Sequence, residues 1–201
     1  MFATKQDIIF AQATPQGKSA LSIIRISGPN LSDVLFSITK RKKLNPRYST
    51  LVNIYNSKNN EIIDSCIVIY YKSPNSFTGE DMLEINCHGS PAITRKIMKT
   101  LISINLRAAK RGEFSFRAFI NKKMDLLQAE AVNELINADF AQKIGPSIKN
   151  IEGRLSKEIG KIKDSLVNLL VIIEHELDFN DGEINETPIK KIIKILNETI
   201  N

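Results

Sequence analysis

Ten apolar residues in the second half of this 201-residue chain recur at spacings of four, three and four residues, a pattern repeated three times. They are Ile144, Ile148, Ile151, Leu155, Ile159, Ile162, Leu166, Leu170, Ile173 and Leu177. Because eleven residues make three helical turns, the pattern predicts one nearly straight helix on the order of 50 Å long. We expect this helix to start or to kink at Gly145 and Pro146. An apolar face of this length needs partner helices.

Neighbouring segments can supply such partners. Asp125 and Asp139 each stand three residues before a glutamine, as in a helix-capping box, and predict helices that begin at Leu126 and Phe140. A third segment, residues 188–200, is apolar on one face and predicts another helix. The sequence therefore predicts that the end of the chain is all helical.

The first part of the chain follows a different pattern, in which short runs of apolar residues predict strands. The expected strands are 8–13, 20–26, 51–55, 62–71 and 82–87, and the expected helices are 31–38 and 92–104. Residues 1–124 carry 19 Lys and Arg against 8 Asp and Glu, whereas residues 125–201 carry 9 against 14. We therefore predict an α+β chain, with a mixed-sheet domain over 1–123 and a helical-bundle segment over 124–201.

The run from Pro74 to Gly89 reads P-N-S-F-T-G-E-D-M-L-E-I-N-C-H-G and joins a turn-forming cluster to a short alternating strand. Alternation places Glu84 on the opposite face from Leu83 and Ile85. If those two residues face the core, Glu84 faces the other side of the sheet. A carboxylate in that position is either solvated or anchors a ligand, and the spacing alone leaves both readings open.

This run closely resembles a signature of the tRNA modification GTPase family known as MnmE or TrmE. Three more stretches fit the family in the same order. They are A-Q-A-T-P-Q-G-K-S-A-L-S-I-I-R-I-S-G from Ala11, R-G-E-F-S-F-R-A-F-I-N-K-K-M-D-L-L-Q-A-E-A from Arg111, and the acidic pattern in 174–186. Four ordered motifs are more specific than one, and they span nearly the whole chain.

The resemblance implies a folate-binding and dimerisation domain with a fold like that of the aminomethyltransferase of the glycine cleavage system, then the first part of a helical domain. It implies a role in tRNA processing, the modification of the wobble uridine of certain tRNAs with a tetrahydrofolate one-carbon unit, carried as formyl- or methylene-tetrahydrofolate. The implied partners are a second copy in a homodimer, the flavoprotein MnmG (GidA) and tRNA, in the cytoplasm and without a membrane. In the family, GTP hydrolysis requires Mg²⁺ and K⁺.

Three residues match the family's folate-contacting positions: Arg25, Glu84 and Lys123. A pterin edge offers a ring N–H beside an amino group, a two-donor fork that the Glu84 carboxylate can accept. Arg25 and Lys123 would meet the carbonyl group or the anionic glutamate tail of the ligand. The alternatives are that Arg25 is simply exposed at a strand end and that Lys123 is solvated. We expect no catalytic residue and no metal ligand.

No G-x-x-x-x-G-K-[ST] sequence followed by a helix occurs in the chain, so the family's GTP-binding domain is not expected within it. Gly17, Lys18 and Ser19 resemble the end of such a loop. However, Gln12 occupies the place of the first glycine, and Pro15 has no amide to offer a phosphate. We expect a hairpin turn there and no GTP hydrolysis by this chain alone. Whether the chain by itself is an enzyme stays open.

Two cysteines, Cys66 and Cys87, do not make a disulfide framework, and with no targeting signal they favour a reducing cytoplasm. Together with His88 and one further histidine they do not supply the close-spaced pairs of a four-ligand metal site. No apolar stretch approaches the ~20 residues that cross a membrane.

The basic first domain would attract a polyanion such as tRNA or a polyglutamylated folate. Its densest basic cluster, residues 40–43, is either a solvated loop or a nucleic-acid contact. The alternative function is therefore a non-enzymatic module in which the basic domain binds RNA and the long helix pairs with a partner.

Overall fold

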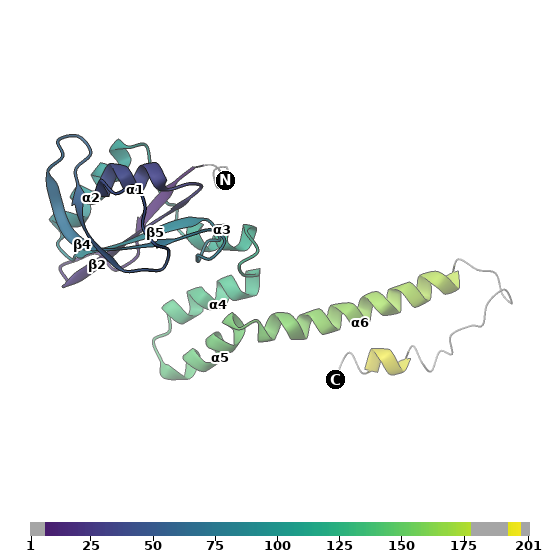
Figure 1. The fold of residues 1–201 in the computed structure, drawn as a ribbon. Helices are drawn as coiled ribbons and strands as arrows, with labels where there is room; N and C mark the ends of the chain where they lie inside the picture. The colour runs from purple at the N-terminus through teal and green to yellow at the C-terminus, as the bar shows by residue number, and fades with distance from the viewer. Residues whose placement is uncertain (1–6, 178–192, 198–201) are drawn as a thin grey trace. The chain divides into compact units, whose positions relative to one another are not determined.

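The computed structural model describes residues 7–177 and 193–197, and the chain divides into two units, Met1–Met124 and Asp125–Asn201. The first unit contains a six-stranded sheet in the order β3-β4-β5-β2-β1-β6 (Figure 1). The strands are β1 (Ile9–Gln12), β2 (Leu21–Gly28), β3 (Thr50–Tyr55), β4 (Ile62–Tyr71), β5 (Asp81–His88) and β6 (Arg107–Ala108). The β1–β6 pair is parallel and the other pairs are antiparallel, so the sheet is mixed, as predicted.

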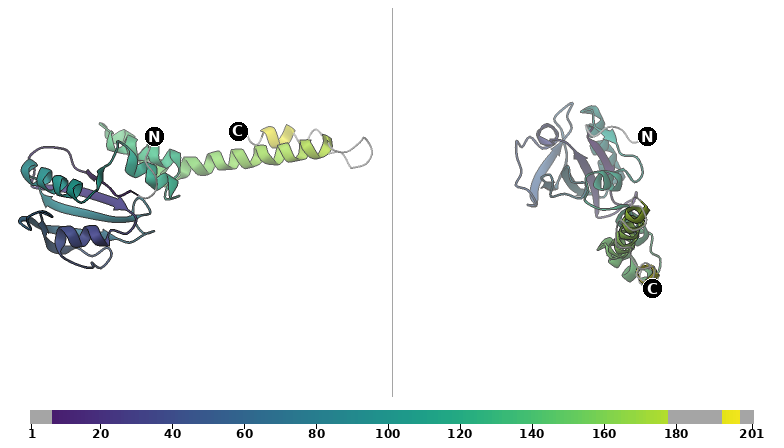
Figure 2. Two further views of the ribbon diagram at one scale, coloured as in Figure 1. Left: turned by 90° about the horizontal axis from the view of Figure 1, so that it is seen from above. Right: turned by 90° about the vertical axis from the view of Figure 1, so that its right-hand side faces the viewer.

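Two helices cover one face of this sheet. They are α1 (Ser32–Thr39) and α2 (Pro91–Ser103), which lie over different parts of the same face (Figures 1 and 2). Their apolar residues join the inward-facing strand residues in one core, which includes Leu35, Ile38, Ile97 and Leu101. This arrangement leaves alternate strand residues on the opposite face free for other roles.

The strands and helices predicted for this unit are all present, with ends shifted by no more than two residues. Two further elements were not predicted: the two-residue strand β6 and the helix α3 (Glu113–Ile120). The buried side of α3 includes the charged residues Glu113 and Arg117. A pattern search for apolar periodicity misses such a helix because its buried positions are partly polar.

The segment around Gly17 connects β1 to β2, which pair antiparallel. The residues after Ser19 form a strand and not a helix, so the chain has no helix N-terminus there to hold a phosphate. The predicted hairpin turn is therefore confirmed.

The second unit contains α4 (Leu126–Ile136), α5 (Ala141–Ile151) and α6 (Arg154–Leu177). The predicted capping box at Asp125 is confirmed, because its carboxylate and the Gln128 side chain each bond the other residue's backbone N–H over 2.9 Å. The predicted start of the next helix at Phe140 was wrong by one residue, because α5 begins at Ala141. Phe140 occupies the N-cap position, and no side chain makes a capping hydrogen bond there. Residues 193–197 are helical, and the rest of the predicted helix 188–200 lies outside the described residues.

The prediction of one continuous helix from Ile144 was also wrong. Gly153 has a φ of +81°, in the left-handed region where glycine is favoured, and the backbone breaks there between α5 and α6. The Gln128 side chain donates a hydrogen bond to the Ile151 carbonyl over 2.7 Å, which satisfies a group near the end of α5. Gly145 and Pro146, where the helix was expected to start or to kink, lie inside α5, and neither α5 nor α6 begins or ends at them.

After the break, α6 runs without interruption for 24 residues, about 36 Å at 1.5 Å per residue (Figure 2). Among the described helices, none is both long enough and apolar enough to cross a bilayer.

Candidate functional site

Arg25 and Glu84 lie opposite each other on the antiparallel strands β2 and β5. Leu83 and Ile85 are fully buried, so alternation places Glu84 on the face away from the core, as predicted. The Arg25 Nε donates a hydrogen bond to the Glu84 Oε1 over 2.7 Å, and the Glu84 side chain is 12% exposed. The two residues therefore form one cross-strand ion pair.

Two aromatic residues complete the surroundings of this pair. The hydroxyl of Tyr71, at the end of β4, donates to the Glu84 Oε2 over 3.1 Å. The ring centroid of Phe77 lies 5.8 Å from the guanidinium carbon of Arg25, within the range of a cation–π contact. Burial raises the pKa of Tyr71, and the charge of Glu84 raises it further. Tyr71 therefore stays protonated at neutral pH and remains a hydrogen-bond donor to Glu84.

The Glu84 carboxylate retains capacity to bind a ligand. An ionised carboxylate has about four lone-pair sites on its two oxygens, and Arg25 and Tyr71 occupy one site on each oxygen. One site per oxygen remains, which is what a two-donor fork requires. Among the described residues, the terminal nitrogens of Arg25 bond no acceptor, so they can still meet a carbonyl or carboxylate oxygen.

Lys123 follows α3 and lies against the loop that precedes β5. A methyl group placed on Gly79 would lie 3.0 Å from the Lys123 Cγ, so the loop backbone and the lysine stem are in close contact. Among the described residues, no hydrogen bond or ion pair joins the Lys123 ammonium to Arg25 or Glu84. The structure thus brings Lys123 to the loop that carries Phe77, without a direct bond to the ion pair.

A network of charged residues lies beside this loop: Asp7, Glu80, Arg107, Glu113 and Arg117. Arg117, which is 7% exposed, donates hydrogen bonds to both oxygens of Glu80 over 3.3 and 3.0 Å and to the Asp7 carboxylate over 2.5 Å. Arg107 donates to both oxygens of Glu113 over 3.1 and 2.6 Å. Each buried charge is therefore paired, which it must be to remain charged away from water.

The network also sets the pKa values of its acids. Hydrogen bonds from Arg107 hold the pKa of Glu113 at about 2, against the burial that would raise it. Burial raises the pKa of Asp7, but the hydrogen bonds and charges of Arg107 and Arg117 outweigh it, so this pKa lies below its ordinary value. Both acids are ionised at neutral pH.

Short polar contacts connect the network to the loop before β5. The Ser27 hydroxyl donates to the Glu80 Oε2 over 2.8 Å and lies 2.6 Å from the Thr78 hydroxyl. Asn121 donates to the Thr78 carbonyl over 2.8 Å. Since Phe77 precedes Thr78, the network positions the ring that lies near Arg25.

Sequence reasoning did not single out Tyr71, Phe77 or the network. Phe77 belongs to the Pro74–Gly89 run, so the motif contained it without assigning it a place. Glu113 and Arg117 stand four residues apart, the spacing of a helical ion pair, and this signal could have revealed α3. Tyr71 offers no local signal, because its contact with Glu84 depends on which strands are neighbours.

The cysteines do not take part in this site. Cys66 and Cys87 are both free and buried. Burial raises the pKa of Cys66 to about 12 and that of Cys87 to about 11, so neither thiol is a ready nucleophile at neutral pH. His88 Nδ1 lies 2.7 Å from the buried Asp64 carboxylate. Within the described ranges, no group of three or more His, Cys, Asp and Glu residues could hold a metal ion.

Comparison with known proteins gives matches over both units. The family described as "GTP-binding protein TrmE N-terminus" matches residues 8–123, and "MnmE helical domain" matches residues 126–201. A "tRNA modification GTPase MnmE" of Francisella tularensis subsp. holarctica is 45% identical over 193 residues, which cover 96% of this chain and 42% of that protein. The protein of the same name in Francisella philomiragia is 46% identical over 187 residues, covering 93% and 41%. The chain spans about two fifths of the length of these relatives.

Proposed function

The chain belongs to the tRNA modification GTPase MnmE family, and from that premise we propose that its first unit binds a tetrahydrofolate one-carbon carrier at Arg25, Glu84 and Lys123. The observation that carries the proposal is the Arg25–Glu84 pair, a carboxylate with one free site on each oxygen beside a guanidinium with free N–H groups. A pterin ring has the matching donor fork and carbonyl group.

Each residue then has a defined task. Glu84 accepts the two donors of the pterin edge, while Tyr71 and Arg25 hold the carboxylate in place from its other sides. The free nitrogens of Arg25 donate to the carbonyl group or to the glutamate tail. Lys123 reaches the anionic tail from the neighbouring loop. The bound folate, as formyl- or methylene-tetrahydrofolate, supplies the one-carbon unit.

The activity of the whole protein is part of the same proposal. The relatives are named for tRNA modification and for GTPase activity. We propose that this chain contributes folate binding to the modification of the tRNA wobble uridine, in the cytoplasm and together with MnmG. The GTP hydrolysis that requires Mg²⁺ and K⁺ is assigned to the family's GTPase domain, because the 201 residues contain no phosphate-binding loop.

We further propose that the first unit forms a homodimer and that folate tightens it. A ligand that binds the dimer better than the monomer must shift the equilibrium toward the dimer. Analytical ultracentrifugation of the chain, with and without saturating formyl-tetrahydrofolate, tests this linkage. We expect the dimer fraction to rise with folate. A monomer at tens of micromolar that stays monomeric with saturating folate would show that the dimer proposal is wrong.

RNA titration tests the alternative function, the RNA-binding module. Saturable binding of a tRNA with a steep salt dependence, in a chain that gives no response to folate, would favour that module over the folate proposal. Saturable folate binding that is lost in Glu84→Gln would favour the folate site.

A further inference from the structure

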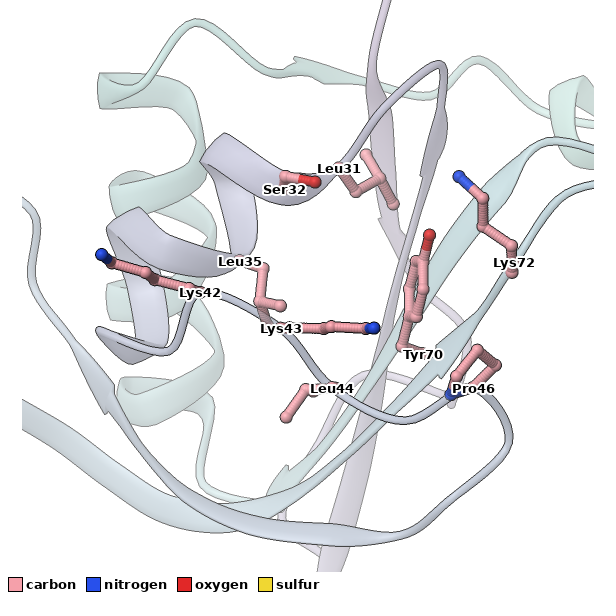
Figure 3. Close-up of a pocket in the computed structure, with 9 residues that line it drawn as sticks. All are labelled: Leu31, Ser32, Leu35, Lys42, Lys43, Leu44, Pro46, Tyr70 and Lys72. Atoms are coloured by element: carbon pink, nitrogen blue, oxygen red, sulfur yellow. The ribbon is translucent and has the colours of Figure 1, made fainter.

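A separate cavity of about 450 Å³ lies on the core side of the sheet, between α1 and the segment before β3 (Figure 3). It is lined by Leu31, Ser32, Leu35, Lys42, Lys43, Leu44, Pro46, Tyr70 and Lys72. Its volume falls within the roughly 300–1,000 Å³ that small-molecule sites usually have. Tyr70 lines it, whereas the next residue, Tyr71, bonds Glu84 on the opposite face, because strand neighbours point to opposite sides. The cavity is therefore not part of the Arg25–Glu84 site.

Part of the wall of this cavity is apolar and buried. Leu31, Leu35 and Leu44 are at most 4% exposed and belong to the core of the first unit. A backbone hydrogen bond from Arg47 to the Tyr70 carbonyl, over 2.7 Å, holds the segment that carries Pro46 against β4. The cavity is thus formed before any ligand arrives, which lowers the entropy cost of binding.

The charged residues that line the cavity are Lys42, Lys43 and Lys72. Lys72 donates to the buried Asp81 over 3.3 Å, and the Tyr70 hydroxyl donates to the same carboxylate over 2.8 Å, so the charge of Lys72 is already paired. Among the described residues, no acidic side chain is paired with Lys42 or Lys43. Figure 3 shows the Lys43 side chain extending between Leu35 and Leu44 toward Tyr70, with its ammonium group at the cavity. An apolar hollow with an unpaired ammonium group favours a ligand that is apolar at one end and anionic at the other.

We propose that this cavity binds a small amphipathic anion, an aromatic or branched apolar body that carries one phosphate or carboxylate group. The apolar body contacts Leu31, Leu35, Leu44 and the Tyr70 ring. The anionic group accepts a charge-assisted hydrogen bond from Lys43, the lysine that extends toward Tyr70 in Figure 3. The proposal does not depend on folate binding at Arg25 and Glu84.

The test titrates phenyl phosphate into the isotope-labelled chain and monitors binding by NMR. Phenol and inorganic phosphate, which each carry one part of the probe, are titrated separately. We expect shift changes at the leucine methyl groups of the cavity and at the Tyr70 ring. Each half should bind at least about tenfold more weakly than phenyl phosphate, because each makes only part of the contacts. Benzoate distinguishes the head groups: tighter binding of benzoate supports a carboxylate ligand, and tighter binding of phenyl phosphate supports a phosphate ligand.

Lys43→Met separates charge from packing, because methionine keeps an apolar stem and loses the ammonium group. This variant should weaken phenyl phosphate binding by about tenfold, and salt should weaken the wild type more than the variant. Lys58→Met removes the same charge at an exposed turn outside the cavity and should leave binding unchanged. Unchanged binding in Lys43→Met, equal binding of inorganic phosphate alone, or no shift changes at the cavity residues would each overturn the proposal.

Discussion

The two units differ in how far their apolar residues are buried. In the first unit, the inward-facing residues of the sheet, such as Ile24, Leu83 and Ile85, are fully buried under two helices. In the second unit, the apolar stripe of α6 is only half covered within the structure: Ile159 is 47% exposed and Leu170 is 58% exposed. A periodic pattern therefore predicts which face of an element is apolar, but it does not predict whether another element covers that face.

The difference in burial separates a unit with a polar site from a unit with an apolar helix face. The Arg25–Glu84 pair is built on two central strands whose other face is a buried core, so its geometry is supported by rigid elements. The second unit offers an apolar helix face in place of a polar site. We infer that ligand binding belongs to the first unit and that the second is suited to packing against other helices.

Hydrogen exchange should show the largest effect, a difference of several kcal/mol in opening free energy between the units. Amides in β2, β4 and β5 should be far better protected than those in α6, because few buried contacts oppose the opening of that helix. Amide exchange followed by NMR or mass spectrometry measures this directly. Equal protection in both units would contradict the comparison and would mean that self-association buries the stripe.

Arg117→Ala should be the most damaging single change in the first unit. It removes the partner of three buried or half-buried acids and should cost about 3–5 kcal/mol of unfolding free energy. All four tyrosines lie in the first unit and the chain has no tryptophan, so tyrosine fluorescence during chemical denaturation reports on that unit alone. Lys96→Ala, which breaks an exposed pair with Glu61 in the same unit, is the control and should cost about 0.5 kcal/mol or less. Similar costs for the two changes would refute the role given to the network.

A pair of glycine substitutions should change the stability of the two units in opposite directions. A Cβ on Gly89 would clash with the Ser19 carbonyl oxygen, so Gly89→Ala should destabilise the first unit by about 1–3 kcal/mol. Gly160 lies inside α6 with no atom within 4 Å of the added Cβ, so Gly160→Ala should stabilise that helix by about 0.5–1 kcal/mol. Thermal unfolding followed by tyrosine fluorescence and by circular dichroism separates the two effects. If both changes had the same sign, the contrast in packing would be wrong.

The smallest effect near neutral pH should be that of pH itself. The pKa of Glu113 is lowered from 4.5 to about 2, so its contribution to stability is complete above about pH 5 and is lost as the pH falls toward 2. The lowered pKa of Asp7 adds in the same direction. Denaturation midpoints of the first unit should therefore be level down to about pH 5 and then decline. A decline that begins near neutral pH would show that other groups control the stability.

Local patterns predicted much of the fold and part of the site. Alternation placed Glu84 on the outer face, and the capping box located the start of α4. What could not be predicted depended on contacts between distant residues. Arg25 and Glu84 are 59 residues apart, and only the order of the strands brings them together with Tyr71.

The break in the long helix shows the same limit. Gly153 can continue a helix or adopt a left-handed conformation, and spacing alone does not decide between them. In the structure, the Gln128 side chain bonds the Ile151 carbonyl beside the break. The helix α3 was missed for a related reason, since the buried Arg117 pairs with Asp7, which lies 110 residues away in the sequence.

The central claim is that Glu84 accepts a folate ligand on the outer face of the sheet. Isothermal titration of formyl-tetrahydrofolate into the wild type, Glu84→Gln and the control Glu61→Gln tests it most directly, since Glu61 is an exposed acid that pairs with Lys96. We predict saturable binding to the wild type and to Glu61→Gln. In Glu84→Gln, binding should be weaker by about 1.5–3 kcal/mol, the value of a hydrogen bond to a charged group. Equal affinity of all three proteins, or no binding to the wild type, would contradict the account.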